Sequence, residues 1–315
     1  MESSDNKVST DLIISALLND SQPFPTNYLY FFSDISAPDL NKIKKIWEKI
    51  SVTRKINLLS DLESLMESDT LLVFDDLAKY ALSDNDPNVR CQAISLLWEC
   101  EDSHVAESFL IMLDEEESES VKLSAAAGLG KFVLLGELDE VSSSLANKII
   151  KSLYQTFETS PSNEIRQEAL KSLSYANQPK IINLISNAFQ ENEPSWQLAA
   201  VISMGRSADE RWEKQILTSL DNSNLPLQIE AVKAAGELEI PDARQKLLDM
   251  LSDSNCDIEL KFQIIWSLSK IGGDEIRDVL GKLLEESKSE DEIEIIEMAL
   301  ENLEFEDGLP SLDIF

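Results

Sequence analysis

One segment recurs along most of this 315-residue sequence, and that repetition constrains the fold more than any other feature. Its clearest copy is DNDPNVRCQAISLLWE, from Asp84 to Glu99. Near the start of each copy stands an apolar residue that opens its helical pattern and that we call the anchor: Val89, Val121, Ile165, Trp196, Leu227, Leu260 and Ile295. Four residues after the anchors stand Ala93, Ala125, Ala169, Ala200, Ala231, Ile264 and Ala299, and eight after them stand Leu97, Leu129, Leu173, Met204, Ala235, Leu268 and Leu303. Residues with this spacing share one face of a helix, so each copy predicts a helix with a buried stripe.

A second apolar stripe follows each anchor by 16, 20 and 24 residues in most copies, and Val105, Phe109 and Leu113 are one example. Each repeat is therefore predicted to be a pair of antiparallel helices that must stack on its neighbours to bury both stripes. The whole chain has only 9 glycines and 10 prolines, which suits an all-helical protein. The predicted fold class is all-α, an α-solenoid (superhelix) of stacked helix pairs.

One repeat is about a dozen residues longer than the others, and its surplus lies at 131–141. The surplus either lengthens both helices or makes a longer loop, and the apolar run FVLL favours extension of the first helix. Insertions on one face of a solenoid are frequent binding features, whereas the plainer interpretation is a packed irregularity.

The repeats define three regions. Residues 1–83 are predicted to form an N-terminal cap, with a short helix in DLIISALLND, an aromatic loop in PFPTNYLYFFSDIS and a divergent helical hairpin at 38–49 and 52–67. Residues 84–305 hold about seven repeats, and 306–315 form a short tail. Atypical segments at the ends of a solenoid seal its exposed apolar faces.

The formal charge of −32, from 27 basic and 59 acidic residues, disfavours whole classes of partner. Such a chain repels phosphate backbones and anionic membranes, so we expect neither nucleic acid nor membrane binding. A basic protein partner fits better, although excess carboxylate is also typical of a solvated surface. The three cysteines form no metal or disulfide pattern, and the N-terminal residues do not read as a signal peptide, so a cytoplasmic protein is expected.

The D-x-D-P-x-V-R-x-x-A pattern of Asp84 to Ala93 resembles HEAT repeats of the short bacterial type, grouped with phycobilin-lyase-like HEAT domains. The resemblance covers 84–305 and implies a platform for binding other proteins. In that class the Arg after the anchor forms a ladder with preceding acids. This chain keeps Arg90 and Arg166 but has Lys122, Gln197, Gln228, Lys261 and Ile296 elsewhere, which argues against a continuous ladder.

Residues with catalytic or ligand-binding chemistry are sparse. The single histidine, His104, stands four residues after Cys100, and we interpret it as an exposed residue near a helix start. The Gly272–Gly273 pair fits a helix C-cap, with Asp274 capping the next helix. The acidic spacings at 84–88 and 253–257 lack the glycine and glutamate of a calcium loop and are better explained as N-caps. We therefore expect no catalytic residue, no cofactor and no metal.

The stretch SMGRSADERW, from Ser203 to Trp212, looks like a site because it gathers arginines, acids and a tryptophan. Within the repeat, Gly205 is expected to end a helix and Trp212 to lie in the core. Arg206 and Arg211 remain as candidate interaction residues, and we expect them on the turn between helices, paired with Asp209 or Glu210.

A second candidate interaction surface is a basic patch in the predicted cap. Lys44, Lys45 and Trp47 mark its centre, and further basic residues surround them: Lys42, Lys49, Arg54 and Lys55. The patch could bind an acidic partner. Its plainer interpretation is a solvated face attracted to acids elsewhere in the chain.

The sequence therefore predicts a non-catalytic scaffold or adaptor that binds a protein partner along the concave face made by successive second helices. The alternative, which comes from the family resemblance alone, is a bilin lyase-like enzyme or lyase subunit acting on antenna proteins. The sequence leaves the oligomeric state open.

Overall fold

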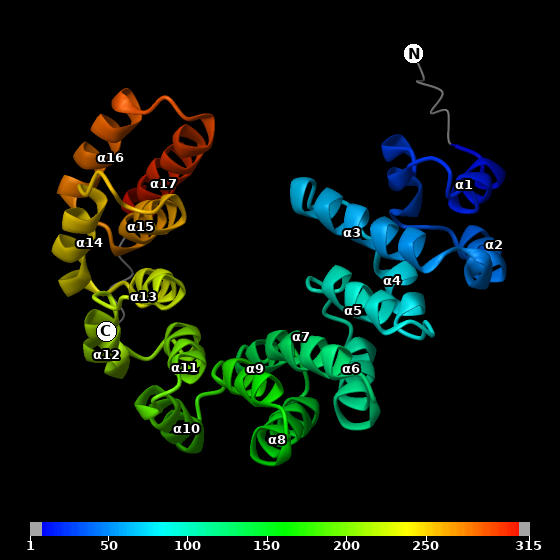
Figure 1. The fold of residues 1–315 in the computed structure, drawn as a ribbon, viewed down its shortest axis with the longest axis horizontal. Coiled ribbons are helices and arrows are strands. Elements are labelled where there is room, and N and C mark those ends of the chain that lie inside the picture. Colours follow the sequence, from blue (N-terminus) through cyan, green and yellow to red (C-terminus); the bar gives the residue numbers. More distant parts are fainter. Residues whose placement is uncertain (1–7, 309–315) are drawn as a thin grey trace. The chain divides into compact units, whose positions relative to one another are not determined.

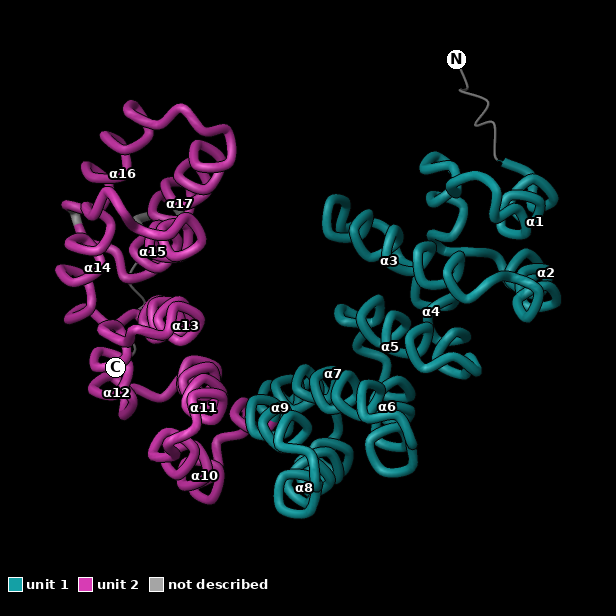
Figure 2. The backbone as a smooth tube through the Cα atoms, in the orientation of Figure 1, with its two compact units in different colours: residues 1–172 teal, residues 173–315 magenta. Residues whose placement is uncertain are grey.

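The structure, a computed structural model, describes residues 8–308, and this part of the chain contains helices and no strand (Figure 1). It divides into two compact units, residues 1–172 and 173–315 (Figure 2). Unit 1 contains α1 (Thr10–Leu17), η1 (Thr26–Phe32), α2 (Ala37–Ile46), η2 (Trp47–Lys49), α3 (Val52–Ser68), α4 (Asp75–Ala81), α5 (Pro87–Leu96), α6 (Ser103–Glu115), α7 (Glu119–Glu137), α8 (Ser143–Thr159) and nearly all of α9 (Asn163–Leu173). Unit 2 contains α10 (Pro179–Gln190), α11 (Pro194–Arg206), η3 (Glu210–Trp212), α12 (Glu213–Ser219), α13 (Leu225–Glu237), η4 (Pro241–Ala243), α14 (Arg244–Leu251), α15 (Ile258–Ile271), α16 (Asp274–Glu286) and α17 (Glu290–Gly308).

The predicted stripes form the core of both units. The helices that carry the anchors, here called anchor helices, are α5, α7, α9, α11, α13, α15 and α17. Six of the seven anchors are buried, as are all residues four and eight positions after them. In the last repeat Ile296 is fully buried and the predicted anchor Ile295 is half-buried, while Ala299 and Leu303 keep the predicted register. Each unit is thus an α-solenoid of stacked antiparallel helices, as predicted.

The helix pairs begin one helix earlier than the sequence analysis placed them. In unit 2, α12 packs closely on α13, α14 on α15 and α16 on α17, whereas α11 and α12 or α15 and α16 contact each other much less. Anchor helices also pack directly on one another, from α11 through α13 and α15 to α17. The anchor helix is therefore the second member of its pair, and the row of anchor helices is the closely packed side of unit 2. The helices expected to form the concave face lie on the other side.

Small residues allow the anchor helices to approach each other. A Cβ added to Gly236 of α13 would lie 2.8 Å from the Cα of Ser267 of α15, and one added to Gly205 would lie 3.2 Å from the Cα of Ala234. The prediction that Gly205 ends a helix was wrong, because α11 continues to Arg206. Ala208 instead adopts the positive φ of 49° that turns the chain.

The predicted N-terminal hairpin and the predicted helix extension at 131–141 are both present in the structure. The hairpin appears as α2 and α3, while the aromatic segment forms the 3₁₀ helix η1 rather than a simple loop. The surplus at 131–141 extends α7 to Glu137, as the apolar run predicted. The division at residues 83 and 305 stays a prediction. Residues 306–308 belong to α17, and the rest of the predicted tail lies outside the described residues.

Candidate functional site

An apolar groove crosses three anchor helices of unit 2. It has a volume of about 550 Å³. It is lined by Ile229 of α13, Ile258, Glu259, Phe262, Gln263 and Trp266 of α15, and Ile295 and Met298 of α17. Ile258 is 57% exposed and Met298 is 49% exposed. A contiguous patch of large apolar side chains facing solvent is uncommon on a monomeric protein and marks an interaction surface.

The groove arises because α15 is apolar on two sides. Leu260, Ile264 and Leu268 face the core, as the repeat requires. Phe262 and Trp266, two and six residues after the anchor, are half-buried on the opposite side. A helix that is hydrophobic all round is normally covered all round, so the outer side of α15 is a surface suited to being covered.

The same two outward positions are apolar on neighbouring helices of unit 2. Ile229 is the residue two after the anchor of α13, and Leu198 and Ile202 are the residues two and six after the anchor of α11. All three are half-buried. The apolar character therefore extends along the row of anchor helices from α11 to α15.

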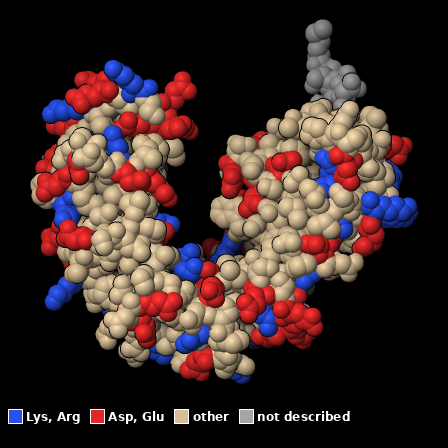
Figure 3. All heavy atoms as spheres, in the orientation of Figure 1, with Lys and Arg blue, Asp and Glu red and all other residues tan. Residues whose placement is uncertain are grey.

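Carboxylates border the groove on the side where the anchor helices begin. Glu259 and Glu294, each one residue before its anchor position, are exposed. Lys261, the nearest base on α15, forms an ion pair with Glu292 of α17. On the face drawn in Figure 3, acidic side chains are spread over both units and exceed the basic ones. The edge of the groove is therefore negatively charged.

Polar residues stand ten positions after three anchors of unit 2, where the anchor helices end, and one of them, Lys270, lies over a residue that lines the groove. The Arg206 guanidinium lies 5.4 Å from the ring centre of Tyr175, and Lys270 Nζ lies 6.0 Å from that of Trp266. Between them, the Glu237 carboxylate lies close over Gly205. The crowding of neighbouring helices removes water from this carboxyl and raises the pKa of Glu237, although Lys233, Lys270 and Arg206 oppose the effect. Arg206 is thus the last residue of α11, an anchor helix, and is not on the turn.

Arg211 is a local feature of the turn, as expected. Its Nε lies 2.6 Å from Asp209 Oδ2, and Asp209 also accepts a hydrogen bond from the Arg211 backbone N–H. Burial raises the pKa of Asp209, but these hydrogen bonds outweigh it and leave the pKa below its usual value. Trp212 is buried, as predicted, and its indole N–H donates to Ser207 Oγ at 3.1 Å. Arg211 and Arg206 therefore do not form one constellation.

The structure does not support a basic surface patch centred on Trp47. Trp47 is 1% exposed, and Arg54 and Lys55 are also buried, so these three belong to the core of unit 1. Lys44 is half-buried, with Nζ 4.8 Å from the ring centre of Tyr80, and Lys45 is exposed. The surface prediction was wrong because the sequence around Trp47 and Lys55 does not show that a buried acid, distant in the chain, pairs with them.

That acid is Asp84, which the sequence analysis took for a capping residue. Its Oδ2 accepts hydrogen bonds from Trp47 Nε1 at 2.6 Å and Lys55 Nζ at 2.7 Å, and its Oδ1 accepts from the Asp86 N–H at 2.9 Å. Burial alone would raise the pKa of Asp84, but these hydrogen bonds hold it below its usual value. The carboxylate is fully used within the fold, and the N-cap of α5 is Asp86.

In four of the seven repeats, the residue after the anchor donates a hydrogen bond to a carbonyl at or after the end of the preceding helix. Arg90 donates to the Asp84 carbonyl at 2.7 Å, and Arg166 donates to the Phe157 carbonyl at 2.8 Å. Where the ladder arginine is replaced, Gln197 and Gln228 donate in the same way to the carbonyls of Glu191 and Leu220. The position thus satisfies carbonyls at helix ends, which is a structural role.

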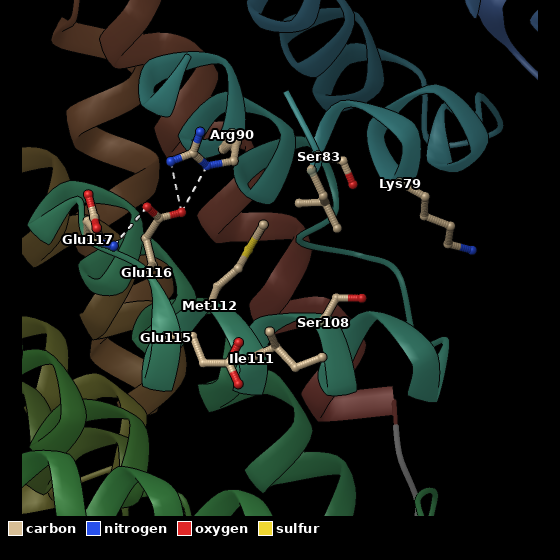
Figure 4. Close-up of a pocket in the computed structure, with 10 residues that line it drawn as sticks. Lys79, Ser83, Arg90, Ser108, Ile111, Met112, Glu115, Glu116 and Glu117 are labelled. Carbon is tan, nitrogen blue, oxygen red and sulfur yellow. Dashed lines mark hydrogen bonds and ion pairs between the residues drawn. The ribbon is translucent and has the colours of Figure 1, made fainter. Parts of the chain in front are cut away.

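A second cavity, of about 510 Å³, lies among α4, α5 and α6 in unit 1 (Figure 4). Arg90 and Glu116 pair on one side of it, with Arg90 Nε 2.9 Å from Glu116 Oε2. Lys79 on the other side lies 2.9 Å from Asp102. Because both cations are held by carboxylates, this cavity offers little attraction to an anionic ligand.

His104 and Cys100, the two residues considered for catalysis, lie in different environments, one exposed and one buried. His104 is 89% exposed at the start of α6, where its Nδ1 lies 2.9 Å from Asp102 Oδ1. Cys100 is buried, and burial and the nearby Asp75 raise the pKa of its thiol to about 11. A thiol held protonated at neutral pH is a poor nucleophile.

Two further sequence expectations concern ligands and membranes. No group of three potential metal ligands occurs within the described residues. Likewise, none of the helices between residues 8 and 308 has the length and hydropathy needed to cross a bilayer.

At the glycine pair, Gly272 has a positive φ of 68° and Gly273 is the N-cap of α16, which corrects the assignment of that cap to Asp274.

The repeat type is decided by comparison with known families. Residues 213–301 match the family model for HEAT repeats. This part of the chain is similar to HEAT repeats. The match starts at the first residue of α12 and ends within α17, so it follows the same phase of helix pairs that the packing shows. The groove lies entirely within the matched residues.

Solved structures with related architecture share little sequence with this chain. YibA of Escherichia coli is 15% identical, with a TM-score of 0.46, and the match covers 96% of this chain and 99% of YibA. The complex of CpcE and CpcF of phycocyanin lyase from Nostoc sp. PCC7120 gives 19% identity and a TM-score of 0.46, over 73% of this chain and 94% of that one. Human deoxyhypusine hydroxylase is 13% identical, with a TM-score of 0.37, over 94% and 96%. Comparison with curated proteins found no match.

The groove was not predicted from the repeat, because the inward-facing positions that define the repeat carry no information about the outward-facing ones. Applied to the positions two and six after each anchor, the same alignment yields Phe262 and Trp266, which no packing requirement of the repeat explains. Large apolar residues at outward positions were the available signal.

Proposed function

We propose that the protein is a non-catalytic HEAT-repeat scaffold or adaptor, and that it binds another protein through the groove on α13, α15 and α17. The observation that carries this proposal is the outward exposure of Phe262, Trp266 and Met298 on helices whose inner faces already complete the core. Aromatic residues and methionine are enriched where proteins meet, because they bury much area with few hydrogen-bonding demands.

A protein surface suits this groove better than the other ligand classes. Its walls are mostly apolar and its edge carries Glu259 and Glu294, so a phosphate backbone or an anionic bilayer would be repelled. The groove is open along several helices, as expected for a surface that receives a chain segment. The net charge of −32 supports a basic partner.

Affinity purification from the native cells tests the proposal. The bait variant Ile258→Glu with Met298→Glu places two charges in the groove at exposed positions. A control variant, Ser95→Glu with Ala127→Glu, adds the same charge at exposed outward positions of α5 and α7. We expect specific partners to be retained by the wild type and the control and lost from the groove variant. Equal retention by all three would contradict the proposal.

The bilin lyase alternative predicts a different result. Addition of a bilin to the pure protein would then shift its visible absorbance, whereas the scaffold proposal predicts an unchanged spectrum. A mobility-shift experiment at low salt tests nucleic acid in the same manner, and a retarded band would overturn the argument from charge.

A further inference from the structure

We infer that the groove receives a short amphipathic helix of the partner protein, with large apolar side chains on one face and lysine or arginine beside that face. This inference rests on the proposed function and specifies the chemistry of the partner. It goes further because it fixes the secondary structure, the length and the charge pattern of the bound segment.

The lining of the groove favours a helix over an extended strand. Every wall is a helix whose backbone groups are already hydrogen-bonded within it, and Glu259 and Gln263 are the polar lining side chains. An extended peptide would leave most of its own N–H and C=O groups without partners against such walls. A helix satisfies these groups internally and presents only side chains to the groove.

The span of the groove sets the length of the bound segment. Three packed helices, α13, α15 and α17, have axes about 8–10 Å apart, so the groove is about 16–20 Å across. A helix rises 1.5 Å per residue, so about 11–13 residues span it. Apolar side chains at positions i, i+3 or i+4, and i+7 of such a helix would reach the apolar walls.

The charges at the groove determine which flank the partner needs. Glu259 and Glu294 are exposed on the edge where the anchor helices begin, and Lys261 is neutralised by Glu292. From Glu290 to Gly308, α17 has acidic residues and no lysine or arginine. Basic residues along one side of the partner helix would therefore be attracted to this edge.

The same charges disfavour two other occupants. A second copy of the chain would bring its own charge of −32 against an acidic edge. The segment 309–315, LPSLDIF, is apolar enough to compete but carries Asp313 and no basic residue. A partner segment with cations satisfies both the apolar walls and the acidic edge.

Selection from a display library of random 16-residue peptides on the immobilised full-length protein tests this inference without a known partner. We expect enriched peptides to have apolar residues at helical spacing and an excess of Lys and Arg. They should bind at least tenfold more weakly to Ile258→Glu with Met298→Glu, and as tightly as before to Ser95→Glu with Ala127→Glu. Circular dichroism confirms that each variant is folded.

The same selection on a charge-reversed variant tests whether the acidic edge determines the charge of the bound peptide. In Glu259→Lys with Glu294→Lys the apolar walls are unchanged, so selection should yield peptides of the same periodicity flanked by Asp and Glu. Enrichment of acidic, aperiodic or extended peptides by the wild type, or no enrichment dependent on the groove, would overturn the inference. Size-exclusion chromatography that shows dimers dissociated by the groove variant would assign the groove to a second copy. Tighter peptide binding after truncation at residue 308 would assign it to the C-terminal segment.

Failure of this inference is distinguishable from failure of the proposed function. If native partners are lost from the groove variant but selected peptides lack basic helical character, the scaffold proposal stands and the helix inference fails. If native partners are retained by the groove variant, both fail.

Discussion

Both units contain a row of anchor helices, but they differ in the residues at the outward-facing positions of these helices. Two residues after the anchor, unit 1 has Cys91, Leu123 and Gln167, whereas unit 2 has Leu198, Ile229, Phe262 and, in the last repeat, Glu297. Six residues after it, unit 1 has Ser95, Ala127 and Lys171, whereas unit 2 has Ile202, Lys233, Trp266 and, in the last repeat, Glu301. The inner positions are equally apolar in both. The fold therefore does not require large apolar residues at the outer positions, and the proposed binding surface uses those that unit 2 carries.

The units also differ in how their interiors are stabilised. Unit 1 buries the Lys55–Asp84 ion pair with Trp47, whereas an ion pair between helices of unit 2, Lys261–Glu292, is partly exposed. A buried charge that loses its partner is costly, whereas a surface pair contributes little. The predictions that follow test this contrast and then the contrast between the outer faces.

The largest effect is expected from Asp84→Ala in unit 1. It leaves the Lys55 ammonium and the Trp47 N–H buried without an acceptor, which should lower the free energy of unfolding by about 3–5 kcal/mol. The matched change in unit 2, Glu292→Ala, should cost about 1 kcal/mol because Lys261 can reach water. Urea unfolding followed by circular dichroism measures both, and equal losses would remove the contrast between the interiors.

The helix contacts should also respond unequally. A Cβ at Gly236 of unit 2 meets the Ser267 Cα and Cβ at 2.8 Å, so Gly236→Ala should cost about 1–3 kcal/mol despite alanine's better helix propensity. At Gly130 of unit 1 the Ser172 Cα and Cβ lie 3.3 and 3.2 Å from the added Cβ, so Gly130→Ala should cost less than Gly236→Ala. Gly281→Ala, with nothing within 4 Å, is the control and should stabilise by about 0.5–1 kcal/mol. Thermal unfolding ranks the three, and another order would contradict this account of the packing.

Acid should change the contributions of Asp84 in unit 1 and Glu237 in unit 2 in opposite directions. The lowered pKa of Asp84 means that its contribution is present above the unfolded-state value near 4 and is lost as the pH falls toward the folded value. The raised pKa of Glu237 means that its destabilising effect is present at neutral pH and is relieved as the pH falls through the folded-state value. Glu237→Gln should therefore slightly stabilise the protein at pH 7 but not at pH 4, whereas Asp84→Asn should destabilise it at pH 7. Unfolding midpoints at both pH values test this, and destabilisation by Glu237→Gln would refute it.

The smallest effect on stability is expected from charges placed on the outer faces. Ile258→Glu with Met298→Glu in unit 2 and Ser95→Glu with Ala127→Glu in unit 1 should each change the free energy of unfolding by less than about 0.5 kcal/mol, because all four positions are exposed. A large loss confined to the groove variant would mean that these residues belong to the core rather than to a binding surface.

The inward-facing pattern was sufficient to predict the fold, because burial at positions 0, +4 and +8 is a requirement of the repeat. The phase of the helix pairs was not predictable, since a stripe every four residues does not reveal which neighbour a helix packs on. The roles of Trp47 and Lys55 depend on Asp84, 29 residues beyond Lys55, and such distant pairing leaves no periodic trace. The groove residues were present in the alignment, but only the exposed fractions distinguish Phe262 from a core phenylalanine.

Site-specific photo-crosslinking in the native cells tests the central claim most directly. A photoreactive amino acid would replace Met298 in the groove or Ala127 at the outer face of unit 1. The account predicts a discrete crosslinked protein from position 298, abolished by Ile258→Glu, and no such product from position 127. Crosslinks to the same protein from both positions, or from position 127 alone, would contradict the assignment of the binding surface to unit 2.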